Sequence, residues 1–344
     1  MTTKIITTNG IQIDRDALLL SAKTLREGGL VVFPTETVYG LGGDGTSEHA
    51  AQKIYAAKGR PSDNPLILHV SSPEDAEAFA ETNATYYKLA NAFMPGPLTV
   101  ILPKKDTVPF SVTGGLDTVA IRCPSHPIAH ALIDAAGIPV AAPSANLSGK
   151  PSPTCARYVI EDLDGRVDII IDGGGCDIGL ESTIIRLDGA DATLLRPGAI
   201  TADALLCVCD SVTVAPSVLE ELGKNERPLS PGMKYKHYAP DVPLILLDGS
   251  EKDVVAFLKN EQKTKKCAIL CYSEELLLLG DKNTIDLGKS DDTETQARKL
   301  FTALRDADKL GVDVIYAHLP NKDGIGLALY NRMIRAAAHT IRKV

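Results

Sequence analysis

Short apolar runs, each ended by a polar loop, are the feature of this sequence that most restricts its fold. They recur through the first half of the chain, and runs of this length bounded by Pro, Gly, Ser or Asn are typical of buried strands. The loops richest in polar groups are Phe33–Gly42, Lys58–Leu66, Pro143–Asn146 and Leu195–Gly198. Loops at strand ends can gather backbone N–H groups, hydroxyls and cations in one cleft. The sequence therefore predicts a site for a small ligand that carries phosphate and carboxylate groups.

Helices are fewer than strands in this half of the chain. We expect strands at 30–33, 66–70, 98–102, 119–122, 139–142, 167–171, 183–187 and 193–195. Helices are expected at 14–28 and 47–57, where Asp14 and Ser47 can act as N-caps and glycines end each helix. Because helices do not separate every pair of strands, we predict a mixed α/β sheet rather than a wholly parallel, doubly wound one.

The second half is expected to form a separate domain after a linker. Residues 208–241 contain several prolines and read as the linker. Strands are then expected at 244–247, 267–272, 284–287 and 312–317, with helices at 250–260 and 293–310 and a closing helix. This alternation predicts a small, mostly parallel three-layer α/β domain. The predicted domains are therefore 1–207 and 242–344.

The net charge of −8 and its distribution argue against binding of long nucleic acids. The acidic excess lies in residues 1–205, which also hold the candidate cationic loops, so a local positive pocket there suits a small anion such as a nucleotide. We expect neither a signal peptide nor a membrane span, and none of the seven cysteines forms a C-x-x-C pair. A cytoplasmic enzyme with reduced cysteines is therefore expected.

Several candidate ligand groups have an equally simple structural explanation. Lys58 and Arg60 follow a predicted helix, where cations either bind phosphate or merely complement the helix dipole. Ser144 and Asn146 could hold phosphate oxygens or only form a turn. Arg122 ends a predicted strand, where it could bind a carboxylate or pair with an acid of the same domain. Taken singly, none of these groups decides the function.

Together the motifs are much more specific. They are Phe33–Gly42, Lys58–Pro61, Asn64–Leu66, Pro143–Asn146, Glu181–Thr183 and Arg196–Gly198. By their order and spacing the chain strongly resembles the YrdC-type threonylcarbamoyl-AMP synthases. Ser230–Pro240 and the α/β segment after it resemble the two-domain form of that family, so the resemblance covers nearly the whole chain. It implies a twisted mixed sheet with a concave active-site face, followed by a Rossmann-like C-terminal domain.

The resemblance also implies a reaction, in which L-threonine, bicarbonate and ATP give threonylcarbamoyl-AMP and pyrophosphate. The product would pass to a tRNA threonylcarbamoyl transferase complex, which modifies the adenosine next to the anticodon. Mg²⁺ is expected on the ATP phosphates, without a metal site made by the protein alone. We expect a monomer that binds no nucleic acid stably. This chemistry needs no enzyme nucleophile, and no Ser–His–Asp or Cys–His arrangement stands out.

The matching motif positions imply two ends of one site. The threonine end consists of Thr35, His69, Arg122, Ala142 and Ser182. The ATP end consists of Lys58, Ser62, Asn64, Thr118, Ser144, Asn146, Ser152, Arg196 and Tyr235. Lys58 and Arg60 are the implied catalytic residues, and Arg122 is expected to hold the threonine carboxylate. Considered without the resemblance, His69 in its apolar strand is typical of a hydrogen-bonded core residue.

Alternatives remain open for the linker and for the function. Tyr235, with Lys234 and His237, is expected to fold over the cleft as a lid, and the alternative is a plain tether. A rival enzyme would make a carbamoyl-adenylate from carbamoyl phosphate and would not need threonine. A rival of another class is an RNA-binding module, which the acidic balance and the lack of aromatic residues interleaved with Lys and Arg disfavour.

Overall fold

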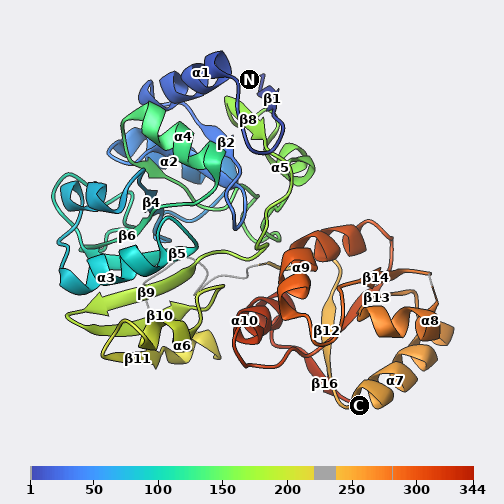
Figure 1. The fold of residues 1–344 in the computed structure, drawn as a ribbon. Coiled ribbons are helices and arrows are strands. Elements are labelled where there is room, and N and C mark those ends of the chain that lie inside the picture. The colour runs from blue at the N-terminus through green and yellow to red at the C-terminus, as the bar shows by residue number, and fades with distance from the viewer. Residues whose placement is uncertain (1, 221–237, 281) are drawn as a thin grey trace. The chain divides into compact units, whose positions relative to one another are not determined.

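The computed structural model describes residues 2–220, 238–280 and 282–344 (Figure 1). The chain divides into two units. The first comprises residues 1–148 and 153–234, and the second comprises 149–152 and 235–344. The short segment 149–152 thus groups with the second unit although it lies within the sequence of the first.

The first unit is built on one mixed sheet, which confirms the predicted fold class. Within the described residues its eleven strands lie in the order β1-β8-β2-β3-β7-β4-β6-β5-β9-β10-β11. The strands are β1 (Lys4–Thr7), β2 (Val31–Phe33), β3 (Gly40–Asp44), β4 (Ile67–His69), β5 (Leu98–Pro103), β6 (Thr118–Arg122), β7 (Val140–Ala141), β8 (Ile169–Asp172), β9 (Thr183–Asp188), β10 (Asp191–Arg196) and β11 (Ser211–Val214). The sheet contains both parallel pairs, such as β4–β6, and antiparallel pairs, such as β5–β6.

The helices of the first unit begin and end at residues suited to those positions. They are α1 (Arg15–Arg26), α2 (Glu48–Lys58), α3 (Ala84–Phe93), α4 (Pro127–Ala136), α5 (Ala156–Leu163) and α6 (Ala202–Leu206), with the 3₁₀ turns η1 (Pro73–Ala78) and η2 (Pro216–Val218). Asp14 and Ser47 accept backbone N–H bonds at the starts of α1 and α2, as predicted. Gly59 ends α2 in the left-handed conformation, with φ of 61°.

An apolar core between α1, α4 and the sheet fixes this part of the fold. Leu25 from α1 and Leu132 from α4 pack with Val31, Phe33 and Ile171, and all five side chains are fully buried. Burying a side chain of this size stabilises the fold by about 1.5–3 kcal/mol. The core therefore holds β2 and β8 firmly and sets where the loop after β2 begins.

Three strands of the first unit differ from the sequence prediction, and β1, near the start of the chain, is one that was not expected. β3 was not expected, because its sequence Gly-Leu-Gly-Gly-Asp is rich in the residue least suited to strands. β11 lies within 208–241, the predicted linker, and pairs in parallel with β10. The linker composition thus extends across residues that belong to the sheet of the first unit.

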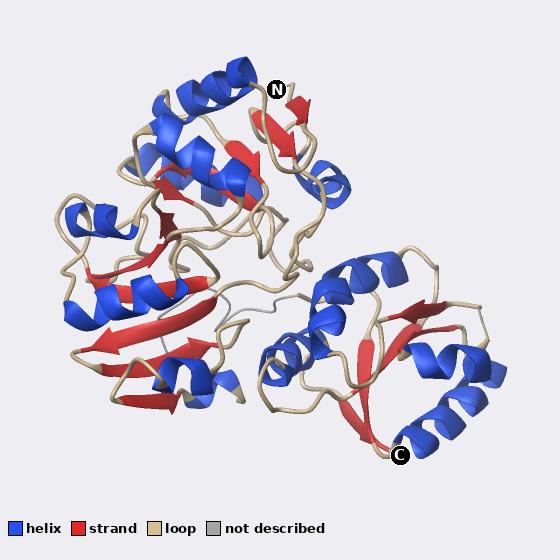
Figure 2. Cartoon of the chain, viewed as in Figure 1, coloured by secondary structure: helices blue, strands red, loops and turns tan. Residues whose placement is uncertain are grey.

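The second unit contains a five-stranded, wholly parallel sheet within the described residues, in the order β14-β13-β15-β12-β16. Its strands are β12 (Leu244–Asp248), β13 (Cys267–Cys271), β14 (Thr284–Asp286), β15 (Val314–His318) and β16 (Ile341–Lys343). Its helices are α7 (Glu251–Thr264), α8 (Leu276–Leu279), α9 (Thr293–Asp308) and α10 (Gly326–Ala336), with the 3₁₀ turn η3 (Ser273–Glu275). Figure 2 shows helices on both faces of this sheet, as the alternating sequence pattern predicted.

Candidate functional site

Lys58 joins two of the predicted loops. The residue ends α2 and is 2% exposed. Its Nζ donates to the carbonyl oxygens of Ser144 and Asn146 at 2.5 Å and 2.6 Å. The Ser144 hydroxyl in turn donates to Asn146 Oδ1 at 2.6 Å, and Ser144 bridges to Gly40 at the start of β3. A buried ammonium therefore holds the loop after β7 against the end of α2.

Arg60 and Asn64 form the other half of this cluster. Arg60 Nη2 donates to the carbonyl oxygens of Asn64 and Pro65 at 3.3 Å and 3.1 Å. Asn64 is 2% exposed, and its buried Oδ1 accepts no hydrogen bond from the described residues. Leaving a buried acceptor unsatisfied costs about 1–3 kcal/mol. A ligand donor at Asn64 Oδ1 would remove that cost.

Strand direction places Thr118 on the same side as this cluster. β4 and β6 are parallel, so the loop Arg60–Asn64 and Thr118 lie at the amino ends of neighbouring strands. Ser62 in that loop is exposed. Arg122 lies at the far end of β6, roughly 13 Å from Thr118 at about 3.3 Å per residue. Seven of the residues predicted for ATP or catalysis thus lie at the same end of β4 and β6: Lys58, Arg60, Ser62, Asn64, Thr118, Ser144 and Asn146.

His69 and Arg122 are the last residues of β4 and β6, where they are register partners. They therefore lie at the carboxyl ends of these strands, away from the Lys58 cluster. Arg122 is 4% exposed, and its Nη2 is 2.6 Å from Glu36 Oε1 in a buried ion pair. Its Nε lies 3.4 Å from the Gly96 carbonyl oxygen. Both readings of Arg122 that the sequence left open are therefore compatible with its position, because an acid pairs with one edge of the guanidinium.

His69 is held as a neutral imidazole. Its ring is 3% exposed, and Nδ1 lies 3.1 Å from the Ile67 carbonyl oxygen. Burial, and next the positive charge of Arg122, lower the pKa of His69 to about 3. The Phe33 ring packs edge-on against it, with centroids 6.4 Å apart. Near neutral pH His69 can therefore donate or accept a hydrogen bond, but it does not carry a charge.

A hydrogen-bonded chain links Ser182 to Arg196. Ser182 Oγ is 2.7 Å from Thr99 Oγ1, and both residues are fully buried. Arg196 Nη2 donates to Ser182 Oγ at 3.0 Å, and its Nε donates to the Ser182 carbonyl oxygen at 2.9 Å. Thr99 is also the register partner of Arg122 on the adjacent strand. Arg196, predicted with ATP, thus contacts a residue predicted with threonine. Thr99 is a neighbour of two predicted site residues, and sequence reasoning missed it.

The remaining predicted residues do not belong to the hydrogen-bonded groups described above. The Thr35 hydroxyl donates to the Val38 carbonyl oxygen at 2.7 Å, so it stabilises its own loop. Ala142 is buried, and its N–H donates to the Ile67 carbonyl oxygen at 2.9 Å. Ser152 is buried in the segment 149–152 of the second unit. Tyr235, Lys234 and His237, which carry the lid hypothesis, lie outside the described residues.

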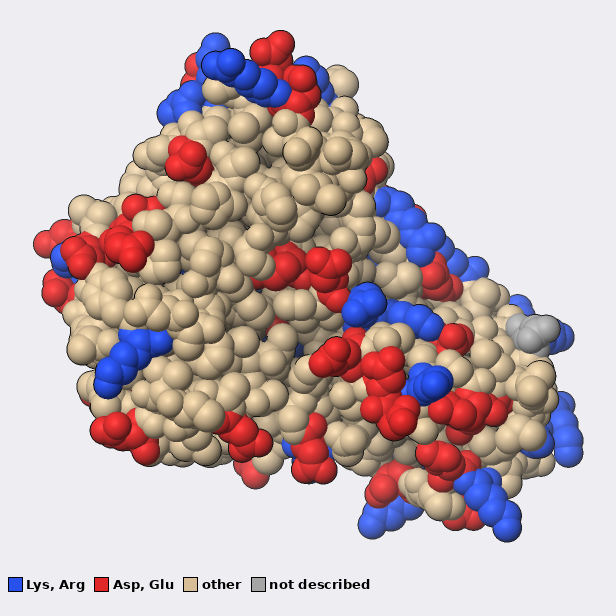
Figure 3. Space-filling model, viewed as in Figure 1, with Lys and Arg blue, Asp and Glu red and all other residues tan. Residues whose placement is uncertain are grey.

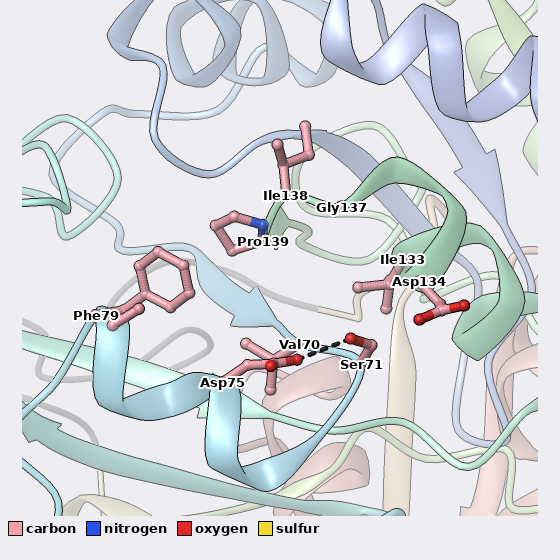
Figure 4. Close-up of a pocket in the computed structure, with 10 residues that line it drawn as sticks. Val70, Ser71, Asp75, Phe79, Ile133, Asp134, Gly137, Ile138 and Pro139 are labelled. Atoms are coloured by element: carbon pink, nitrogen blue, oxygen red, sulfur yellow. Dashed lines mark hydrogen bonds between the residues drawn. The ribbon is translucent and has the colours of Figure 1, made fainter.

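A separate hollow of about 250 Å³ lies between η1 and the end of α4 (Figure 4). Its walls are mostly apolar, and Ser71 at its floor donates to Asp75 at 2.7 Å. The lining residues are Val70, Ser71, Asp75, Ala78, Phe79, Ile133, Asp134, Gly137, Ile138 and Pro139. None of them is a predicted site residue, so this hollow is distinct from the clusters above.

Charge, metal ligands, hydropathy and cysteines add four further observations. The face of the first unit seen in Figure 3 carries acidic and basic side chains in small, separate groups. Among the residues that the structure describes, no group of three or more His, Cys, Asp or Glu side chains could hold a metal ion. Over the same residues, no helix combines the length and apolar character needed to cross a bilayer. None of the seven cysteines, which all lie in the described residues, forms a disulfide.

Comparison with known proteins assigns both units. Residues 23–198 match the Sua5/YciO/YrdC family, described as telomere recombination, and residues 200–338 match the threonylcarbamoyl-AMP synthase C-terminal domain. The fold and these matches define an enzyme of the two-domain Sua5 class. The chain belongs to the threonylcarbamoyl-AMP synthase family, as the sequence resemblance indicated.

Relatives of known name extend over almost the whole chain. It is 44% identical to the threonylcarbamoyl-AMP synthase of Pyrococcus abyssi over 344 residues, covering 97% of each protein. It is also 44% identical to the Bacillus subtilis enzyme of that name, covering 96% of this chain and 94% of the relative. The crystal structure of P. abyssi Sua5 complexed with L-threonine matches all of both chains, with a TM-score of 0.90 and 42% identity.

Proposed function

We propose that this chain condenses L-threonine, bicarbonate and ATP to threonylcarbamoyl-AMP and pyrophosphate. The observation that carries the proposal is the full-length match to P. abyssi Sua5 complexed with L-threonine, at a TM-score of 0.90. The two clusters of polar groups at the two ends of β4 and β6 support it, because the reaction needs one site for an amino acid and another for a nucleotide.

The proposed chemistry takes place between the substrates. The threonine amine attacks the carbon of bicarbonate, which loses water to form a carbamate. A carbamate oxygen then attacks the α-phosphorus of ATP, the bond to the β-phosphate bridging oxygen breaks, and pyrophosphate leaves. The protein contributes orientation and stabilisation of charge rather than a nucleophile.

The roles that we propose follow from the two clusters. On one side Arg122 binds the threonine carboxylate, while neutral His69 and the Ser182 hydroxyl supply hydrogen bonds without adding charge. On the other side Lys58 and Arg60 hold the loops that surround the nucleotide, and Asn64 Oδ1 accepts a ligand donor. Arg196, which the resemblance assigned to ATP, bonds to Ser182 and so lies with the groups proposed for threonine.

We further propose that Mg²⁺ arrives on the ATP phosphates, where it would neutralise charge on the departing pyrophosphate. This mode is common for Mg²⁺, which usually binds substrate phosphates together with one or two carboxylates. We also propose that the product is consumed by a group-transfer enzyme that acts on tRNA, that this chain works in the cytoplasm, and that it does not need to bind nucleic acid stably. We propose a monomer as the working unit.

Pyrophosphate release from ATP, with threonine, bicarbonate and Mg²⁺ omitted one at a time, tests the proposal. Loss of release on every omission is expected. Release that needs carbamoyl phosphate but not threonine would instead establish the carbamoyl-adenylate alternative. Salt-sensitive binding of RNA without any release would favour the RNA-binding alternative.

A further inference from the structure

Glu36 is buried beside Arg122 although it comes from a distant part of the chain. It lies in the loop between β2 and β3 and is 6% exposed. Oε1 accepts from Arg122 Nη2 at 2.6 Å, and Oε2 accepts from the Ser125 backbone N–H at 3.2 Å. The Ile178 N–H donates to the Glu36 carbonyl oxygen at 2.9 Å, which fixes the backbone as well. The carboxylate is thus held by two donors, one on each oxygen, and the backbone of the residue is held by a third.

The contacts of Arg122 use two of its three guanidinium nitrogens, Nε and Nη2. Nη2 donates to Glu36, and Nε lies at a long 3.4 Å from the Gly96 carbonyl oxygen. Nη1 makes no hydrogen bond to any residue that the structure describes. A guanidinium is a rigid planar fork, so fixing one nitrogen fixes the direction of the others.

The surroundings explain why Arg122 needs a fixed partner. His69, its register partner, is uncharged and cannot balance the guanidinium. A buried cation without a counter-ion is unfavourable, and a long flexible side chain would turn toward any nearby acceptor. Glu36 both balances the charge and defines the orientation of the fork.

We propose that Glu36 is a positioning residue for the amino-acid substrate. It holds Arg122 by Nη2, so that Nη1 faces the substrate carboxylate and binding needs no reorientation of the side chain. This inference rests on the proposed function only in naming threonine as the substrate. Glu36 itself does not touch the substrate, so its effect must pass through the carboxylate–Arg122 contact.

Binding of L-threonine and of L-threoninamide, measured by calorimetry, separates this role from a general structural one. The amide lacks the carboxylate charge that Arg122 is to bind. For Glu36→Ala we expect the threonine Kd to rise about tenfold or more, because a charge-assisted contact loses its fixed donor. The Kd for L-threoninamide should change less than about twofold. Glu36→Gln keeps an oxygen that can accept from Nη2, so it should restore part of the threonine affinity.

Glu27→Ala is the matched control, because Glu27 pairs with Lys23 at 3.7 Å on the exposed surface of α1. It should leave both Kd values unchanged. Equal weakening of both ligands by Glu36→Ala, or no weakening of threonine, would overturn the inference. Pyrophosphate release by the wild-type protein is measured separately. If the wild type binds threonine but releases no pyrophosphate, the proposed function is wrong and the role of Glu36 can still hold. If the wild type binds no threonine, both the proposed function and the role of Glu36 are wrong.

Discussion

Replacing Lys58 with methionine tests whether its ammonium group holds the loop after β7. Methionine keeps an apolar stem of similar length in a site that is 2% exposed. It removes the donors to the Ser144 and Asn146 carbonyl oxygens, at 2.5 Å and 2.6 Å. Hydrogen bonds to charged groups contribute about 1.5–3 kcal/mol each. We therefore expect the free energy of unfolding of the first unit to fall by roughly 3–5 kcal/mol.

Differential scanning calorimetry of the full chain without nucleotide measures this loss. In a domain of this size each kcal/mol lowers Tm by about 2–4 °C, so the transition of the first unit should fall by about 10 °C. Lys53→Met is the matched control on the same helix. Half-buried Lys53 donates to a single carbonyl oxygen among the described residues, that of Gly28 at 2.7 Å. Its Tm should fall by only about a third as much. Equal shifts for the two variants, or less than about 3 °C for Lys58→Met, would refute the reasoning.

Three further substitutions examine other contacts of the site. The pKa of His69 is about 3 in the folded protein against 6.5 for the free group, so the unfolded chain binds the extra proton first and stability falls as pH drops from 6.5 toward 3. In His69→Gln the free energy of unfolding, measured by urea titration at several pH values between 6.5 and 3, should fall less steeply. The same dependence on pH as in the wild type would contradict the lowered pKa of His69. Asn64→Leu removes an unsatisfied buried acceptor, so Tm should stay level or rise while the KM for ATP increases about tenfold. An unchanged KM would show that no ligand donor meets this oxygen. Thr99→Val removes the 2.7 Å contact to Ser182, and we expect a loss of about 1 kcal/mol in stability and a raised KM for threonine, both restored by Thr99→Ser. Equal KM values for the two variants would argue against a role of this hydroxyl.

Local signals explain the parts of the fold that the sequence predicted well. N-caps, helix-ending glycines and apolar runs act over a few residues, so α1, α2 and most strands lie where these signals placed them. β3 was not predicted, because its glycines are required by side chains of neighbouring strands that pack against them. A Cβ on Gly42 would lie 2.7 Å from Val140 and 2.8 Å from Phe33, which only the folded sheet reveals.

In the site, too, local sequence signals identify some residues but not the distant residues that contact them. The motifs carried Lys58, Arg122 and Ser182 into the prediction because each lies in a recognisable segment. The partners that orient them do not lie nearby: Glu36 is 86 residues from Arg122, and Thr99 is 83 residues from Ser182. Glu36 lies in the Phe33–Gly42 motif, but the motif does not reveal which distant side chain it pairs with, and Thr99 lies outside the motifs. Only sheet register and loop packing identify these two as partners of Arg122 and Ser182.

Mass spectrometry of the product formed from ATP, L-threonine and ¹³C-labelled bicarbonate tests the central claim most directly. The account predicts a threonine-containing adenylate that carries one ¹³C atom and forms in equal amount with pyrophosphate. An adenylate without the label, or pyrophosphate released without any threonine adduct, would contradict it.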